Sequence, residues 1–207
     1  PVSGRNLFVS NNWKLEILRG ACLLLTTGFN FLAMRYLPLT VTSAIQFTSP
    51  LIICAMSGPL LGDKVGWRRW LAILVGFSGI LIIVRPGTEA FQPAALLSLG
   101  CAFFLALFSI LTRKLAGVDS ALTQQFYAGA TPVILLAPIA FTDWVWPSQP
   151  ISWVAFAVMG AAGLGGHYLN SVAHRYATPA TLAPFSYLSL LYLAVASWLI
   201  FNQPPDR

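Results

Sequence analysis

The chain has 207 residues, of which 57% are hydrophobic and only 9% are charged. A soluble domain carries roughly 25% charged residues, so this chain has too little polar surface to cover a globule in water. Its composition therefore excludes a soluble globular protein and predicts an integral membrane protein. The net charge of +6 would suggest nucleic-acid binding in a soluble protein. Here the basic residues lie at the ends of apolar segments, where they indicate topology instead.

Seven apolar stretches are long enough to cross a bilayer, which takes about 20 mostly apolar residues. In chain order they cover roughly 17–36, 39–61, 67–84, 93–111, 121–141, 151–173 and 179–201. The stretches are too long and too aliphatic for the strands of a membrane barrel, which alternate over about ten residues. We therefore expect an all-α fold, a polytopic membrane helix bundle without strands.

The basic residues of the loops predict how the chain is oriented in the membrane. If the N-terminus is cytoplasmic and the spans alternate, nine basic residues are inside and three are outside. The inner set is Arg5, Lys14, Arg19, Lys64, Arg68, Arg69, Arg113, Lys114 and Arg175; the outer set is Arg35, Arg85 and Arg207. Cytoplasmic loops carry an excess of Lys and Arg. The asymmetry therefore favours a cytoplasmic N-terminus.

An internal repeat relates the first two spans to the last two. With an offset of 140 residues, 20–63 aligns with 160–203 without a gap. The identical pairs include Gly20 and Gly160, Asn30 and Asn170, Arg35 and Arg175, Tyr36 and Tyr176, and Ser57 and Ser197. Because the two copies begin five spans apart, one copy is inverted relative to the other. Many secondary transporters are built from such inverted repeats and bind substrate at the repeat interface near the bilayer midplane.

A repeat unit of five helices implies ten helices in two complete copies. We therefore expect this chain to hold the third to ninth of ten helices, although a native seven-span protein stays open. On this basis residues 1–88 form part of the first repeat, with helices three to five. Residues 89–207 form part of the second repeat, with helices six to nine.

Several motifs follow one another in a characteristic order. The chain reads FLAMRYLPL at 31–39, AIQFTSPL at 44–51, LLGD at 60–63, WRRW at 67–70, AHRY at 173–176, LAPFSY at 182–187 and FNQPPD at 201–206. In order and spacing they resemble the two EamA domains of the drug/metabolite transporter (DMT) superfamily. The resemblance covers nearly the whole chain. One departure is that the family often has Glu where Asp63 and Gln203 stand.

The resemblance implies an EamA-type, ten-helix, multi-pass transporter of the cell inner (cytoplasmic) membrane. Substrates in that family include amino acids, nucleotide-derived metabolites, vitamins and drugs. We therefore expect a secondary transporter that moves a small organic metabolite or drug-like solute by alternating access. The expected partners are a small-molecule substrate and the lipid bilayer but no nucleic acid, and a homodimer stays open. No enzyme activity, catalytic residue, metal or cofactor is expected.

Polar side chains deep in the spans are the candidates for substrate binding. They are Asn30, Gln46, His167, Asn170, Ser186 and Tyr187. Asn30 and Asn170 are repeat mates near the middle of their spans, and their amides suit a polar, uncharged or zwitterionic solute. His167 lies one helical turn before Asn170, on a similar face. We expect these groups to face one central cavity; hydrogen bonding between helices is the alternative role.

The remaining polar residues and the cysteines are not predicted to form a site. Glu16 and Arg19 stand at the start of the first span and the span interiors have no acidic residue, which argues against a carboxylate proton relay. Gln124 begins a span and is expected to be solvated. The cysteines lack metal-ligand spacing and are expected to be small buried hydrophobic residues; they are Cys22, Cys54 and Cys101.

The main alternative function is that of a seven-helix membrane receptor or scaffold without transport activity. A retinal protein needs a Lys in its last span, and 179–201 has none. A receptor would leave the repeat of 140 residues unexplained. An intramembrane enzyme would need a recognisable catalytic set, and the sequence has no Gly-x-Ser-x-Gly and no pair of carboxylates within the spans.

Overall fold

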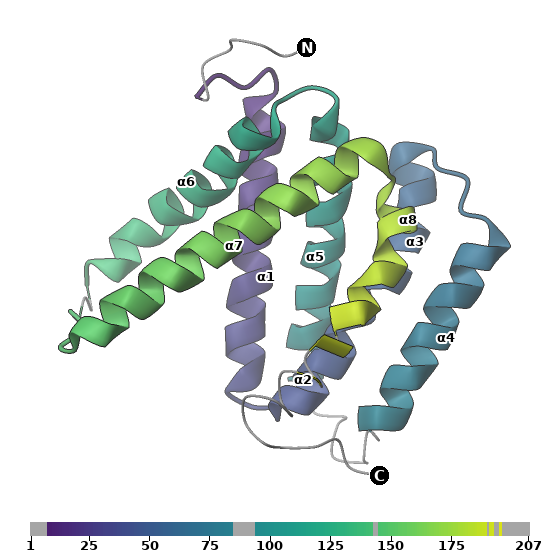
Figure 1. Ribbon diagram of the computed structural model, residues 1–207, viewed down its shortest axis with the longest axis horizontal. Coiled ribbons are helices and arrows are strands. Elements are labelled where there is room, and N and C mark those ends of the chain that lie inside the picture. Colours follow the sequence, from purple (N-terminus) through teal and green to yellow (C-terminus); the bar gives the residue numbers. More distant parts are fainter. Residues whose placement is uncertain (1–7, 85–93, 143–144, 190, 193–194, 196–207) are drawn as a thin grey trace.

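The computed structural model describes residues 8–84, 94–142, 145–189, 191, 192 and 195. Every regular element among these residues is helical, which confirms the predicted all-α fold. Figure 1 shows the helices side by side as a bundle. In chain order they are α1 (Trp13–Met34), α2 (Leu39–Gln46), α3 (Ser49–Leu61), α4 (Trp67–Val84), α5 (Ala95–Ala116), α6 (Ala121–Ala140), α7 (Pro150–Tyr176), α8 (Pro179–Leu182) and the 3₁₀-helix η2 (Ala183–Tyr187).

Five of the predicted spans are single helices close to the predicted boundaries, namely α1, α4, α5, α6 and α7. Within the described part of the chain, three segments are long and apolar enough to cross a bilayer by length and composition: Trp13–Met34, Val41–Leu61 and Ala95–Ala116. The remaining long helices, α4, α6 and α7, have 18, 20 and 27 residues. These lengths support a polytopic helical membrane protein.

The other two predicted spans are broken, which the sequence analysis did not anticipate. The span 39–61 is interrupted after Gln46 and resumes at Ser49. Pro50, the second residue of α3, has no N–H to bond the carbonyl of Gln46 four residues earlier, so the helix is interrupted there. The turn is closed instead by hydrogen bonds between residues three apart. One of them runs from the N–H of Thr48 to the carbonyl of Ile45, at 3.0 Å.

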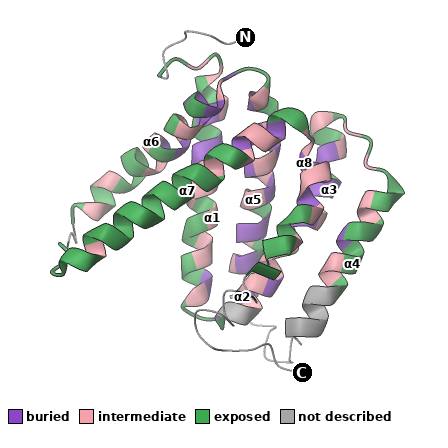
Figure 2. Cartoon of the chain, in the orientation of Figure 1, coloured by how far each residue is buried: buried purple, intermediate pink, exposed green. Residues whose placement is uncertain are grey.

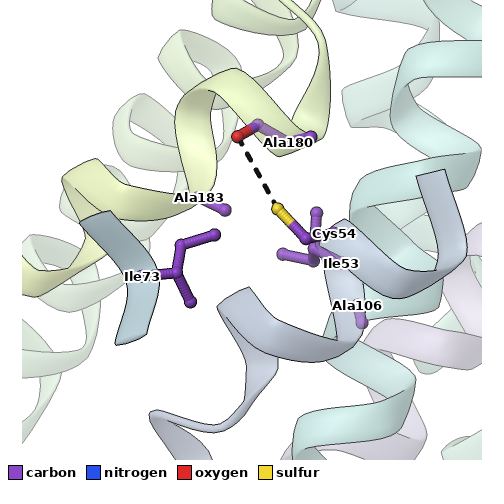
Figure 3. Close-up of a cluster of buried hydrophobic side chains, with 6 residues drawn as sticks. All are labelled: Ile53, Cys54, Ile73, Ala106, Ala180 and Ala183. Atoms are coloured by element: carbon purple, nitrogen blue, oxygen red, sulfur yellow. Dashed lines mark hydrogen bonds between the residues drawn. The ribbon is translucent and has the colours of Figure 1, made fainter. Parts of the chain in front are cut away.

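The last predicted span begins with the four residues of α8 and continues as η2. Pro184 likewise lacks the N–H that would bond the carbonyl of Ala180. That carbonyl lies 4.0 Å from the thiol sulfur of Cys54 on α3, as Figure 3 shows. Residues 190, 193–194 and 196–201 of this predicted span lie outside the described residues, as do the repeat mates Ser197 and Gln203.

Successive long helices run in alternating directions (Figure 1). The start of α1, the α3–α4 and α5–α6 loops and the end of α7 therefore gather at one end of the bundle. Helices α1 and α7 run in opposite directions (Figure 1), and Arg19 near the start of α1 bonds Ser171 near the end of α7. The inverted repeat predicts this opposition. Lys64, Arg113 and Arg175 from the predicted cytoplasmic set belong to this end.

Helix α5 is the centre of the packing, while much of α6 and α7 is exposed (Figure 2). The buried residues of α5 include Cys101, Ala102, Ala106, Phe108, Leu111 and Leu115. One apolar cluster joins α3, α4, α5 and the α8–η2 segment (Figure 3). Its buried members are Ile53, Cys54, Ile73, Ala106, Ala180 and Ala183. Cys22, Cys54 and Cys101 are free and buried, as predicted.

Helices α1 and α6 pack closely at Gly20, where a Cβ atom would lie 2.6 Å from Cβ of Thr131. Gly20→Ala is therefore expected to lower the free energy of unfolding by about 1–3 kcal/mol, because the added methyl group overpacks the contact. The repeat mate Gly160 has no atom within 4 Å of such a Cβ. Gly160→Ala is the matched control and should raise stability by about 0.5–1 kcal/mol. Thermal unfolding of the purified variants in detergent measures both effects. A Gly20→Ala variant as stable as the Gly160→Ala variant would contradict close packing of α1 against α6.

Candidate functional site

A cavity of about 440 Å³ opens between α3, α5, α7 and the α8–η2 segment. Its volume lies within the range of about 300–1,000 Å³ that is typical of small-molecule sites. The polar residues of its lining are Ser49, Ser109, His167, Asn170, His174 and Ser186. Ile53, Leu105, Phe108 and Leu182 supply apolar surface. None of the described residues that line it is Asp, Glu, Lys or Arg, so the cavity suits an uncharged solute.

The α7 wall of the cavity offers the groups that best suit solute binding. The ring of His167 meets the ring of Phe108 edge to face, with 5.9 Å between the ring centroids. One turn later, the side-chain amide of Asn170 has no hydrogen-bond partner among the described residues. Gly163 and Gly166 precede these residues and leave this part of the wall without side chains.

His174 completes this wall, although it is not among the candidates from the sequence. Its Nδ1 lies 2.8 Å from the carbonyl oxygen of Asn170. A carbonyl oxygen only accepts, so Nδ1 carries the proton and Nε2 is left as an acceptor. That Nε2 is buried and has no hydrogen-bond partner among the described residues. In its neutral form, His174 therefore presents Nε2 as a free acceptor among the residues that line the cavity.

The other predicted site residues form bonds between elements instead of lining the cavity. The side-chain amide of Gln46 donates to the side-chain oxygen of Asn30, which joins α2 to α1. The hydroxyl of Tyr187 donates to the carbonyl of Phe47 at 3.2 Å, and the two rings stack at 5.9 Å. The structure thus brings His167, Asn170 and Ser186 together, and it places Asn30, Gln46 and Tyr187 outside the lining of this cavity.

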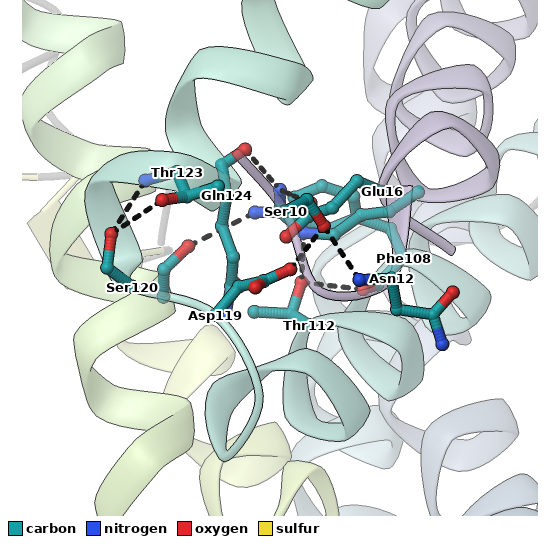
Figure 4. Close-up of polar contacts among 11 residues, drawn as sticks. Ser10, Asn12, Glu16, Phe108, Thr112, Asp119, Ser120, Thr123 and Gln124 are labelled. Carbon is teal, nitrogen blue, oxygen red and sulfur yellow. Dashed lines mark hydrogen bonds and ion pairs between the residues drawn. The ribbon is translucent and has the colours of Figure 1, made fainter. Parts of the chain in front are cut away.

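A buried polar cluster lies beside the cavity and was not anticipated from the sequence (Figure 4). Arg19 is fully buried; its Nε donates to Thr112 at 2.8 Å, Nη1 to the carbonyl of Gln124 at 2.8 Å, and Nη2 to Ser171 at 3.1 Å. Glu16 is also fully buried, with its Oε2 3.7 Å from Nη1 of Arg19. One arginine therefore joins α1 to α5, α6 and α7.

Two expectations about this region were wrong. Gln124 is fully buried and not solvated, because α1 covers the start of α6. Glu16 is a buried acidic residue inside α1, so the argument against a carboxylate relay does not hold. The available signal was the spacing of three residues between Glu16 and Arg19, which places opposite charges on one helix face. Only the packing of α5, α6 and α7 shows that this face points inward.

The cluster and the cavity share the ring of Phe108. The guanidinium carbon of Arg19 lies 4.6 Å from the centroid of that ring, while His167 contacts the same ring from the cavity. A cation over an aromatic face is attracted by the ring quadrupole. A change in the charge or position of Arg19 would therefore affect the wall of the cavity through the side chain of Phe108.

The segment before α1 is held at the same end of the bundle by Asp119. This carboxylate accepts hydrogen bonds from the hydroxyl of Ser10, from the backbone N–H of Asn11 at 2.8 Å and from the Asn11 side chain at 2.9 Å. Arg175 donates to the backbone carbonyl of Asp119 at 2.8 Å. Burial alone raises the pKa of Asp119, but hydrogen bonds from Asn11, Ser10 and Asn12 outweigh it and hold the pKa below its usual range. The resulting stabilisation is present above the unfolded-state pKa and is lost as the pH falls through the lower folded-state pKa.

These features define the class of protein. Helices of transmembrane length, two broken segments and a cavity with an uncharged polar lining are typical of a multi-pass membrane protein that binds small molecules. Among the described residues, no three His, Cys, Asp or Glu side chains are grouped so that they could hold a metal ion.

The profile of the EamA-like transporter family matches residues 2–85 and 92–207. The chain belongs to this family, and it is a membrane transporter and not an enzyme. It is 26% identical over 204 residues to the S-adenosylmethionine uptake transporter of Rickettsia prowazekii, covering 99% of this chain and 69% of that protein. It is 33% identical over 181 residues to the riboflavin transporter of Vibrio cholerae, covering 84% of this chain and 59% of that protein.

Two further comparisons agree with this assignment. The pseudopaline exporter CntI of Pseudomonas aeruginosa is 25% identical over 177 residues, covering 85% of this chain and 62% of that protein. One crystal structure superposes with a TM-score of 0.77 at 20% sequence identity, covering 94% of this chain and 70% of that chain. The superposition supports the fold, and the related sequences support the transport of small metabolites.

Proposed function

We propose that this protein moves a small, uncharged organic metabolite across the inner (cytoplasmic) membrane by alternating access of two inverted repeats. The observation that carries the proposal is the position of the cavity. Its lining combines α3, from the predicted first repeat at 1–88, with α5, α7 and α8–η2, from the predicted second repeat at 89–207. A solute bound there would touch both repeats at once, as alternating access requires.

The broken helices support this assignment. Both predicted spans that are interrupted, α2–α3 and α8–η2, contribute residues to the cavity: Ser49 and Ser186 lie just beyond or within the two breaks. Interrupted segments at corresponding positions of two repeats are a typical sign of a transporter binding site. Helix breaks also leave backbone groups without helical partners, and these groups can bind a solute or change partners as the repeats move.

The chemistry of the lining limits the solute. A charged solute would have to leave water without an opposite charge in the lining, which costs on the order of several kcal/mol. His167, Asn170 and the serine hydroxyls offer both donors and acceptors, and the ring of Phe108 offers an apolar face. We therefore propose an uncharged, flat, hydrogen-bonding solute. Of the substrates that the names of the relatives give, riboflavin fits this chemistry better than the sulfonium cation S-adenosylmethionine.

The test is uptake of radiolabelled riboflavin by proteoliposomes that contain the full chain. We expect saturable, time-dependent uptake that excess unlabelled riboflavin abolishes. Flavin mononucleotide is the matched control solute, since it keeps the ring and adds a phosphate dianion; it should compete at least about tenfold less well. Binding without time-dependent accumulation in the vesicle would instead indicate a receptor or scaffold. Equal competition by both flavins would overturn the uncharged-solute assignment.

A further inference from the structure

Glu16 is the least well-satisfied charged group among the described residues. Its side chain is fully buried, and no donor group of the described residues bonds either carboxylate oxygen. It does make a side-chain contact with another carboxyl, that of Asp119. Arg19 is 3.7 Å away, but its Nε, Nη1 and Nη2 each donate to another acceptor. Arg19 therefore supplies an opposite charge to Glu16 without a hydrogen bond. This environment is unusual for a permanently ionised carboxylate, which normally accepts several hydrogen bonds when buried.

Among the described residues, Arg19 is the one cation paired with Glu16. On α1 the neighbouring charge is Arg19, and at the α5–α6 loop it is Asp119, a like charge whose oxygens are bonded to Ser10 and Asn11 (Figure 4). Thr112 on α5 and Gln124 on α6 do not titrate. On α7, Arg175 donates to the backbone carbonyl of Asp119 at 2.8 Å, and His174 lies within electrostatic reach of Arg19. Loss of water, missing donors and a like charge all disfavour the ionised form of a carboxyl.

We propose that Glu16 is the proton-binding site through which a transmembrane proton gradient drives transport; this inference rests on the proposed function. In the step, an O–H bond of a hydronium ion breaks, its proton forms an O–H bond to a carboxylate oxygen of Glu16, and a water molecule is released. The Glu16–Arg19 pair then changes from net neutral to a net charge of +1. The new O–H is a donor in a cluster where both side-chain polar atoms of Gln124 are buried and unpartnered.

The contacts of Arg19 link this step to the cavity. Release of the proton leaves a buried carboxylate without hydrogen-bond donors, which favours a conformation in which water reaches the cluster. Arg19 bonds α5, α6 and α7 from α1, so hydration of the cluster requires these helix ends to separate. Phe108, which Arg19 covers, is also part of the cavity wall. Protonation and solute binding therefore bias the same equilibrium between conformations, and each changes the affinity for the other.

The test compares two modes of riboflavin transport in the same proteoliposomes. With the membrane potential clamped, a pH gradient of about one unit should support up to about tenfold accumulation by the wild-type protein if one proton is coupled, since about 1.4 kcal/mol corresponds to a factor of ten. Glu16→Gln, which keeps the shape but cannot ionise, should lose this accumulation. It should retain exchange of riboflavin at equal concentrations on both sides. Asp63→Asn, in the α3–α4 loop, is the matched control and should behave like wild type.

A second measurement uses the unmodified chain. Dicyclohexylcarbodiimide reacts with protonated carboxyls in apolar surroundings, so peptide mass spectrometry should find Glu16 labelled, and less so as the pH rises. Accumulation that persists in Glu16→Gln, loss of exchange together with accumulation, or absence of labelling would each overturn the proposal. Failure of the wild-type protein to exchange riboflavin would instead contradict the proposed function, and the labelling experiment would still report on Glu16.

Discussion

Replacing Arg19 with methionine is expected to lower the free energy of unfolding by about 3–5 kcal/mol, the typical cost of removing one partner from a buried ion pair. The change leaves Glu16 without a counter-charge and leaves acceptors on Thr112, Gln124 and Ser171 without their donor. Methionine keeps most of the apolar stem, so lost packing contributes little. Thermal unfolding of purified protein in detergent, together with expression level in the membrane, measures the effect.

Arg68→Met is the matched control, since Arg68 is exposed at the start of α4. It should change the free energy of unfolding by less than about 0.5 kcal/mol, as surface substitutions usually do. Adding Glu16→Gln to Arg19→Met should restore part of the lost stability, because the unpaired charge is then removed as well. An Arg19→Met variant as stable as wild type would contradict the role of this cluster in holding the four helices together.

Replacing Asn170 with leucine is expected to reduce riboflavin uptake about tenfold, since a solute group left without its partner costs about 1–3 kcal/mol. Stability should hardly change, because the Asn170 amide lines the cavity and has no hydrogen-bond partner among the described residues. Initial uptake rates in proteoliposomes, corrected for the amount of folded protein, measure the first effect. Thermal unfolding of the same preparation measures the second.

The repeat supplies the control for this prediction. Asn30 is the repeat mate of Asn170, but its side chain is bonded to Gln46 and is not part of the cavity lining. Asn30→Leu should therefore cost about 1 kcal/mol of stability, the usual worth of one intramolecular hydrogen bond. It should leave the uptake of the surviving protein nearly unchanged. If Asn30→Leu abolished uptake and Asn170→Leu only lowered stability, the assignment of the cavity as the binding site would be wrong.

The long helices could be predicted from the sequence because each is a property of a local apolar run. The span predicted at 67–84 is α4 with the same limits. The breaks were missed for a physical reason. Pro50 and Pro184 lie within the apolar runs, but whether a proline bends a helix or ends it depends on partners for the freed carbonyl groups. One such partner, the thiol of Cys54 for Ala180, comes from a distant part of the chain.

The candidate site was predicted in part. His167, Asn170 and Ser186 were found from depth in the span and from the repeat, and these features depend on spacing alone. Asn30, by contrast, had the same depth and residue type as its mate, yet the bond with Gln46 occupies it. The repeat makes positions equivalent in sequence, but it does not make their neighbours equivalent. The burial of Glu16 and Arg19 was not predicted, because it depends on the packing of three other helices against α1.

The stacked rings of Phe47 and Tyr187 join two positions separated by the repeat offset of 140 residues. Two equivalent positions of a duplicated unit can touch each other only where the symmetry axis passes. If the chain arose by fusion of a duplicated gene, the ancestral residue at this position met its own copy in a dimer of oppositely inserted subunits. After fusion, the two equivalent positions could hold different residues. One ring now carries a hydroxyl that bonds the backbone of the other, a one-sided arrangement that distinct positions allow.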